Sequence, residues 1–175
     1  MNPAGTVAVG TALPDWTIAV SPAAMRVTSA VCRDPNPIHW DRDASMAAGF
    51  GGRVVNQGPL NLAYVANMLA AWAGPDALRR LSARFVAVVR EGDHVTAGGI
   101  VTAVETGQSG ARLAHCDIWL DRDDGVRAVV GTAVVQLGAA VAEPATFKSP
   151  TLSHSKLTST KPRSHDRSRR AKVAL

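Results

Sequence analysis

The longest apolar stretch of the chain predicts a buried helix over 58–73. Its residues are apolar nearly all round, which is typical of a helix that is covered on most sides. Pro59 suits a first helical turn, and Gly74-Pro75 ends the stretch with a glycine followed by a residue that cannot continue a helix. Both ends of the helix are therefore signalled in the sequence.

Four shorter elements are predicted before this helix. A β-prone run occupies 16–20. Ser21 then provides an N-cap for a helix that extends to about Val31. Residues 33–37 contain two prolines and are predicted to form a rigid loop, and 41–48 form a short helix.

After the central helix the apolar period changes to that of strands. Turn-forming residues separate four segments, 79–90, 95–104, 112–120 and 126–137, which we predict to form an antiparallel meander. In the third segment every second residue is apolar, which predicts one dry face made by Ala114, Cys116, Ile118 and Leu120. A sheet curled around one long helix is an α+β arrangement.

The charge of the chain is divided unevenly and predicts a domain with a tail. Residues 1–143 hold 11 Lys+Arg and 13 Asp+Glu, whereas 144–175 hold 8 basic residues and 1 acidic residue, a charge of +7. The second segment has almost no large apolar side chain with which to offset its ordering entropy. We predict one domain over 1–143 and a disordered basic tail over 144–175. The tail alone makes the chain basic, so a specific nucleic-acid partner is not expected.

Several classes of protein are disfavoured by what the sequence does not contain. Cys32 and Cys116 have no C-x-x-C spacing and no neighbouring histidines, so neither a disulfide scaffold nor a zinc site is expected. The sequence begins without the basic-then-apolar pattern of a secretory signal, and no stretch is apolar enough to span a bilayer. We expect a soluble, cytoplasmic protein that needs no metal and makes no membrane contact.

The candidate chemistry begins with Asp34-Pro35-Asn36-Pro37-Ile38-His39, in which a carboxylate and an imidazole bracket two prolines. The prolines restrict the backbone, so both side chains can be held in a fixed relation, and such a pair can orient water and exchange protons near neutral pH. Asn36 can brace the loop by side-chain to backbone hydrogen bonds. The same residues also fit an ordinary Asx-type turn in which Asp34 and His39 are solvated.

A second candidate is the start of the central helix, Asn56-Gln57-Gly58-Pro59-Leu60. Unpaired N–H groups at a helix start can stabilise a developing enolate oxygen, and glycine lets the backbone approach closely. Gly58 is the natural donor because Pro59 has no N–H. An ordinary helix N-terminus has the same features.

Taken together, the two segments resemble the MaoC-like family of (R)-specific enoyl-CoA hydratases and dehydratases, which have a hot-dog fold. The family motif, approximately G-D-x-N-P-[LIV]-H, stands here at 33–39 and differs only at its first position, Arg33. The resemblance continues through Gly58-Pro59-Leu60, where Asn56-Gln57 stand in place of the family's Ala-His, and covers roughly 12–138.

The resemblance implies a catalytic role for Asp34 and His39, which would activate water, and a backbone N–H from Gly58 to the thioester oxygen. Coenzyme A or an acyl carrier would be part of the substrate, and no other cofactor is implied. The implied reaction adds water to a trans-2-enoyl thioester, giving an (R)-3-hydroxyacyl product, or runs in reverse. The family also implies a homodimer or a hetero-oligomer with another hot-dog subunit.

Two alternatives stay open at this point. Hot-dog thioesterases usually carry a carboxylate on or near the central helix, and 58–73 contains no Asp or Glu, which disfavours that class. Some relatives that act on steroid side-chain thioesters resemble small catalytic subunits that depend on a different hot-dog partner. The Arg before Asp34 and the Trp-Ala-Gly-Pro sequence at 72–75 are similar to theirs.

Overall fold

A computed structural model describes residues 7–106 and 110–138, which contain a five-stranded antiparallel sheet and three α-helices. The tail predicted over 144–175 lies outside the described residues, so its boundary stays a prediction. In chain order the elements are β1 (Trp16–Ala19), α1 (Pro22–Cys32), the short 3₁₀ helix η1 (Pro37–His39), α2 (Arg42–Ala47), α3 (Gly58–Ala73), β2 (Leu78–Phe85), β3 (His94–Thr106), β4 (Arg112–Arg122) and β5 (Arg127–Leu137).

The helices begin and end at residues that cap them. The Ser21 side chain accepts a hydrogen bond from the Ala23 N–H at the start of α1, and the Asp41 side chain caps α2 in the same way. Helix α3 spans the predicted range, and Gly74 ends it with φ 105°, a backbone angle that favours glycine. The predicted central helix is confirmed.

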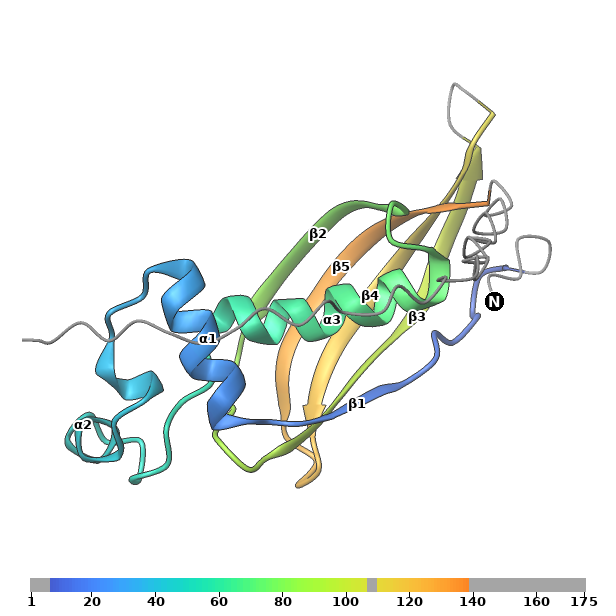
Figure 1. The fold of residues 1–175 in the computed structure, drawn as a ribbon. Helices are drawn as coiled ribbons and strands as arrows, with labels where there is room; N and C mark the ends of the chain where they lie inside the picture. The colour runs from blue at the N-terminus through green and yellow to red at the C-terminus, as the bar shows by residue number, and fades with distance from the viewer. Residues whose placement is uncertain (1–6, 107–109, 139–175) are drawn as a thin grey trace, which may run out of the picture. The chain divides into compact units, whose positions relative to one another are not determined.

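Helix α3 lies in the curve of the sheet and contacts all five strands (Figure 1). Val65, Met68 and Leu69 on this helix are almost fully buried against the sheet. The predicted dry face of β4 is confirmed, because its four alternate apolar residues are at most 2% exposed. This core is the sheet curled around a helix that defines the hot-dog fold, as the resemblance implies.

The predicted four-strand meander is wrong in one respect. The sheet order is β1-β3-β4-β5-β2, so β3, β4 and β5 form a meander while β2 pairs with β5 at the far edge and β1 occupies the free edge of β3. The segment between β2 and β3 therefore crosses one end of the sheet instead of making a hairpin. Its backbone N–H groups are used along that path: Val86 donates to Ala128 beside β5, and Gly92 donates to Val20 beside β1.

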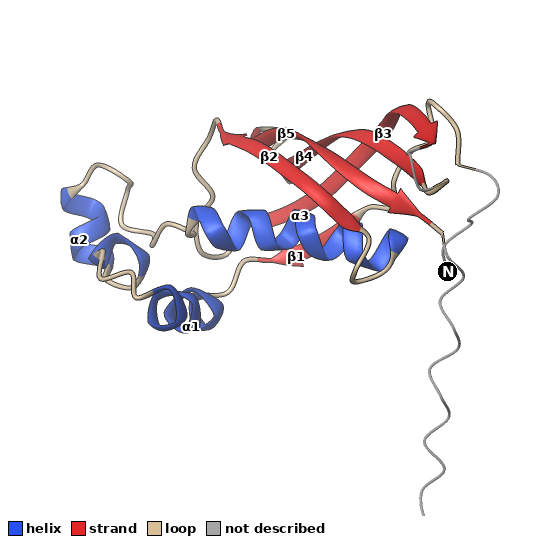
Figure 2. Cartoon of the chain, turned by 90° about the horizontal axis from the view of Figure 1, so that it is seen from above, coloured by secondary structure: helices blue, strands red, loops and turns tan. Residues whose placement is uncertain are grey.

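The two short helices lie away from the sheet. Both views place α1 beside the N-terminal end of α3 and α2 beyond that end (Figure 1 and Figure 2). The chain from α1 through η1 and α2 thus returns to the first turn of α3. This arrangement brings the two candidate segments of the sequence, around Asp34 and around Gly58, to the same end of the fold.

Candidate active site

The structure brings Asp34 and His39 together. The carboxylate atom Oδ2 of Asp34 lies 3.3 Å from the imidazole Nε2 of His39. The other carboxylate atom, Oδ1, accepts a hydrogen bond from the Asn36 N–H at 3.1 Å. The His39 side chain is 10% exposed and that of Asp34 is 31% exposed, so the pair is sheltered on the histidine side and open on the carboxylate side.

The orientation of the His39 ring is fixed by a backbone carbonyl. Its Nδ1 lies 2.7 Å from the carbonyl oxygen of Val55. A carbonyl oxygen can only accept, so Nδ1 must carry the proton and Nε2 is the atom left to exchange one. The nitrogen that faces Asp34 is therefore the one available for acid–base chemistry.

Local backbone geometry explains how six residues hold the pair. Helix α1 ends at Cys32 and is capped by Arg33, which has φ 51° and ψ 42° and is the one non-glycine residue with positive φ in the described part of the chain. The left-handed turn directs the chain into Asp34, whose N–H donates to Ser29 O at 2.9 Å. Asn36 then caps η1 by accepting a hydrogen bond from the Ile38 N–H. The bond to Ile38 is a side-chain to backbone hydrogen bond of the kind that the sequence predicts for Asn36, and its bracing role stays a prediction.

The segment that carries Val55 is paired on its other side with the crossing segment between β2 and β3. The Asn56 N–H donates to Val89 O at 2.8 Å, and the Glu91 N–H donates to Val54 O at 2.9 Å. These bonds form a short two-stranded ladder. The carbonyl that orients His39 is consequently part of paired backbone and not of a free loop.

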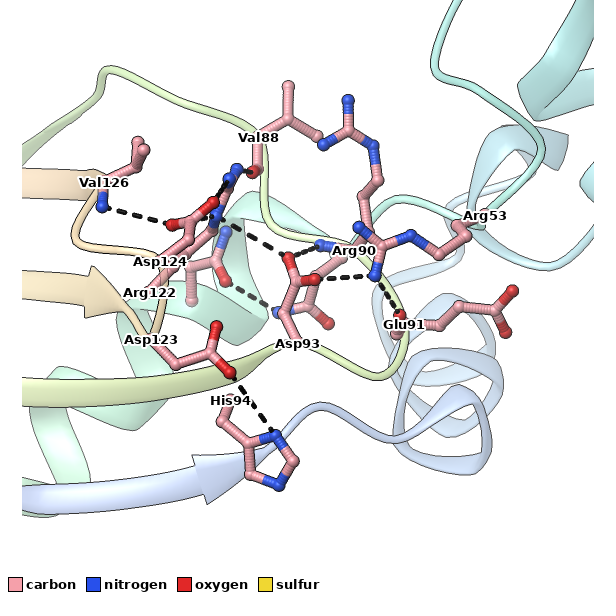
Figure 3. A network of polar contacts seen from close by, with 12 residues as sticks. Arg53, Val88, Arg90, Glu91, Asp93, His94, Arg122, Asp123, Asp124 and Val126 are labelled. Atoms are coloured by element: carbon pink, nitrogen blue, oxygen red, sulfur yellow. Dashed lines mark hydrogen bonds and ion pairs between the residues drawn. The ribbon is translucent and has the colours of Figure 1, made fainter.

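A buried carboxylate anchors the crossing segment (Figure 3). Asp93 is 8% exposed and accepts from Arg53 Nη1 at 2.7 Å and from the Arg90 N–H at 2.9 Å. Arg122 approaches the same carboxylate at 3.9 Å and donates to the Val88 carbonyl at 2.7 Å. Three segments that are distant in sequence, around Arg53, Asp93 and Arg122, are thus joined.

Gly58, the predicted backbone donor, is the first residue of α3. Its N–H belongs to the helix start, where no intrahelical partner exists, and among the described residues it makes no backbone hydrogen bond. A Cβ at this position would lie 3.0 Å from the Phe85 ring, so only glycine fits without a shift. Gly58 is linked to His39 through Val55, which lies three residues earlier in the chain and whose carbonyl oxygen contacts the His39 ring.

Buried amides beside Gly58 were not predicted from the sequence. Asn56 donates to Asn61 Oδ1 at 2.7 Å, and burial raises the pKa of the nearby Tyr64, an effect that a hydrogen bond from Asn56 partly offsets. Within the described residues, Asn56 Oδ1 and Gln57 Oε1 are buried without a hydrogen-bond partner. The signal was available, because Asn61 and Tyr64 are one helical turn apart in a mostly apolar helix.

A cavity of about 580 Å³ opens beside His39. Its walls combine apolar, aromatic and charged side chains, namely Pro22, Arg26, Trp40, Asp41, Arg42, Val54 and Glu91. Arg42 and Glu91 neutralise each other across it, with Nε 2.7 Å from Oε1. His39 thus lines a cavity, whereas Asp34 and Gly58 are not among its lining residues.

Residues 7–106 and 110–138 contain no group of three or more His, Cys, Asp or Glu side chains placed to hold a metal ion. No helix in that part of the chain is both long and apolar enough to cross a membrane.

Known proteins similar to this chain share its fold. An (R)-hydratase from A. caviae involved in PHA biosynthesis is 25% identical, with a TM-score of 0.69 over 77% of this chain and 99% of that one. A chain of the ChsH1-ChsH2 complex from Mycobacterium tuberculosis is also 25% identical, with a TM-score of 0.66 over 76% of this chain and 100% of the other. The C-terminally truncated HadBC (3R-hydroxyacyl-ACP dehydratase) complex from the same organism, at 15% identity and a TM-score of 0.59 over 75% and 98%, shares the fold alone.

The sequence itself points to the same group. No curated protein sequence matches the chain. The family model described as MaoC like domain matches residues 8–113, which include the whole of the Asp34 to His39 motif, α3 and β3. Because this match covers more than half of the 175 residues, the chain belongs to the MaoC-like family of hot-dog hydratases and dehydratases.

Proposed function

We propose that this protein is an (R)-specific enoyl-CoA hydratase, or the corresponding 3-hydroxyacyl dehydratase, with Asp34 and His39 as its catalytic pair. The observation that carries the proposal is the 3.3 Å approach of Asp34 Oδ2 to His39 Nε2, with Nδ1 of the same ring held by Val55 O. Membership of the MaoC-like family and the 25% identity to an (R)-hydratase support it.

In the proposed reaction, Asp34 and His39 act together as the acid–base group that accepts a proton and returns one. A water molecule bound against Asp34 Oδ2 and His39 Nε2 gives a proton to the pair while its oxygen bonds to C3 of the enoyl thioester. The pair returns a proton to C2, so water is added and the enzyme is unchanged. In the reverse direction, the 3-hydroxyacyl thioester loses the same two groups.

Gly58 completes the proposed mechanism. As C3 is attacked, negative charge develops on the thioester oxygen, and a donor that is already in place stabilises it. The free Gly58 N–H at the start of a 16-residue helix provides such a donor, and the helix dipole favours the same charge. Coenzyme A, or an acyl carrier, enters as part of the substrate, and the mechanism uses no other cofactor.

The substrate assay follows directly. Purified protein is mixed with crotonyl-, octenoyl- and polycyclic enoyl-CoA, and loss of enoyl absorbance is followed, with chiral analysis of the product. We expect turnover of at least one substrate with formation of the (R)-3-hydroxyacyl thioester. Release of free thiol without loss of the enoyl group would instead identify a thioesterase, and an (S) product would reject the proposed stereochemistry.

A second assembly is favoured by one comparison. The ChsH1-ChsH2 structure is a complex, and its matched chain is covered over its full length by this one. We propose that this protein acts either as a homodimer or as the catalytic small subunit of a hydratase with a second hot-dog subunit, taking bulky acyl groups in the latter case. Light scattering during the assay distinguishes these assemblies from an active monomer, which would contradict both.

A further inference from the structure

Gln57 is a buried polar residue whose contacts link the two halves of the candidate site. Its side chain is 1% exposed, and its Nε2 donates to the carbonyl oxygen of Met25 and to the hydroxyl of Ser29, both at 2.8 Å. Met25 and Ser29 lie on α1, whereas Gln57 is the N-cap of α3. The side chain therefore joins two helices through both of its N–H groups.

The amide orientation follows from chemistry. The Met25 carbonyl can only accept, so the atom that faces it must be the nitrogen. This choice leaves Gln57 Oε1 buried with no partner among the described residues, which is costly. The two bonds that the nitrogen makes are therefore the contacts that hold the Gln57 side chain in its buried position.

The contact with Ser29 leads directly to Asp34. The Ser29 carbonyl accepts the N–H of Asp34 at 2.9 Å, so the residue that Gln57 holds is the one that fixes the entry to the motif. On the same short segment, Val55 O orients His39 at 2.7 Å, and Gly58 follows Gln57 immediately. Residues 55–58 thus contact the His39 ring directly, through Val55, and reach the backbone of Asp34 indirectly, through Ser29.

We infer that Gln57 is a positioning residue, which sets Asp34 against His39 and Gly58 by holding the last turn of α1. The expected effect on turnover rests on the proposed function, whereas the expected effect on the position of Asp34 rests on the structure alone. A histidine, the residue in the family pattern, offers one N–H at a similar reach from the backbone. The departure from the pattern at this position therefore keeps a donor.

The test compares Gln57→Leu, which removes the donors at similar volume, with Gln57→His, which keeps one. We expect Gln57→Leu to lower kcat by about 10- to 100-fold with little change in KM, because small misplacements of reacting groups have effects of this size. Gln57→His is expected to stay within about fivefold of the parent kcat. Ile118→Val, a buried change in β4, controls for lost stability and should leave kcat unchanged.

A readout independent of activity separates this inference from the proposed function. Amide hydrogen exchange at Asp34 should become about 10-fold faster in Gln57→Leu and recover in Gln57→His, while amides in the middle of α3 stay protected. Parent-like exchange at Asp34 in Gln57→Leu overturns the inference, as does a loss of kcat that histidine does not restore. A parent protein that turns over no enoyl thioester, either alone or together with a second hot-dog subunit, would reject the proposed function, and the exchange result would still decide the role of Gln57.

Discussion

His39 Nε2 faces Asp34 Oδ2 at 3.3 Å, while its Nδ1 is bonded to Val55 O at 2.7 Å. This geometry gives the first prediction: Asp34→Asn and His39→Ala each lower turnover of an enoyl thioester by about 100-fold or more, because each removes a positioned acid–base group. Circular dichroism and melting temperature should show an intact fold in both variants. Steady-state kinetics on a substrate that the proposed enoyl-CoA assay identifies provide the measurement.

A second histidine–carboxylate pair supplies the control for that prediction. His115 Nε2 lies 2.8 Å from Glu105 Oε1, and both side chains are well exposed on the sheet. His115→Ala should leave turnover unchanged. Near-full activity in either Asp34→Asn or His39→Ala would remove the proposed pair from the mechanism.

The second prediction concerns Arg33, which holds a left-handed conformation where the family motif has glycine. Arg33→Gly should change the free energy of unfolding by less than about 1 kcal/mol, because relief of strain is offset by greater freedom in the unfolded chain. Arg33→Val should destabilise by about 1–3 kcal/mol, since a β-branched residue tolerates positive φ worst. Urea unfolding measures both, and equal stabilities would show that the turn relaxes.

The third prediction is a pH dependence of stability set by Glu91. The hydrogen bond from Arg42 holds the pKa of Glu91 below its ordinary value of 4.5, against the opposing effect of burial. A lowered folded-state pKa contributes stability that is present above about pH 4.5 and is lost as the pH falls through the lowered value. Glu91→Gln should therefore be less stable than the parent at pH 7, and the difference should shrink as the pH falls towards 3.

Urea unfolding at intervals between pH 3 and pH 7 checks this dependence. Arg42→Gln removes the partner of Glu91 and should likewise make the stability depend less on pH between 3 and 7. Because Arg42 is largely exposed, solvent screening limits the size of the effect. A stability difference that is constant over this range would show that the ion pair is not responsible.

Local signals allowed much of this fold to be predicted, and the exceptions share a cause. Helix α3 was predicted to the residue because Pro59 and Gly74 punctuate it, and the period of β4 identified its buried face. The pairing of β2 with β5 was not predicted, because the period of a strand does not encode which strand lies beside it. The order of the strands depends on the path of the crossing segment, whose backbone N–H groups donate to Ala128 beside β5 and to Val20 beside β1.

The same distinction holds at the candidate site. Two prolines between Asp34 and His39 allowed the sequence to predict that the pair would be held together. The partner of His39 at Nδ1 is the backbone carbonyl of Val55, and any residue at position 55 has such a carbonyl, so the sequence does not reveal this contact. The bonds from Gln57 to α1 join residues about 30 positions apart, and no local pattern encodes such a contact.

The fourth prediction concerns the segment after residue 143. Its charge of +7 favours weak, salt-dependent binding to polyanions, and Phe147 is its one aromatic residue, so it lacks the stacking side chains of a specific nucleic-acid site. The family model ends at 113, and the last described strand ends at Leu137. The residues of the proposed mechanism, Asp34, His39 and Gly58, all lie well before this segment, so we expect catalysis not to depend on it.

A chain cut after Glu143 should keep the turnover, oligomeric state and melting temperature of the full chain, and should lose any affinity for heparin or DNA at low salt. A full-length variant in which Arg167, Arg169 and Arg170 are changed to Gln provides the matched control, because it keeps the length and removes part of the charge. Its polyanion affinity should fall between those of the two chains and decrease with salt. If the cut abolishes turnover or lowers the melting temperature by several degrees while the arginine variant does neither, residues after 143 belong to the folded domain and the proposed boundary is wrong.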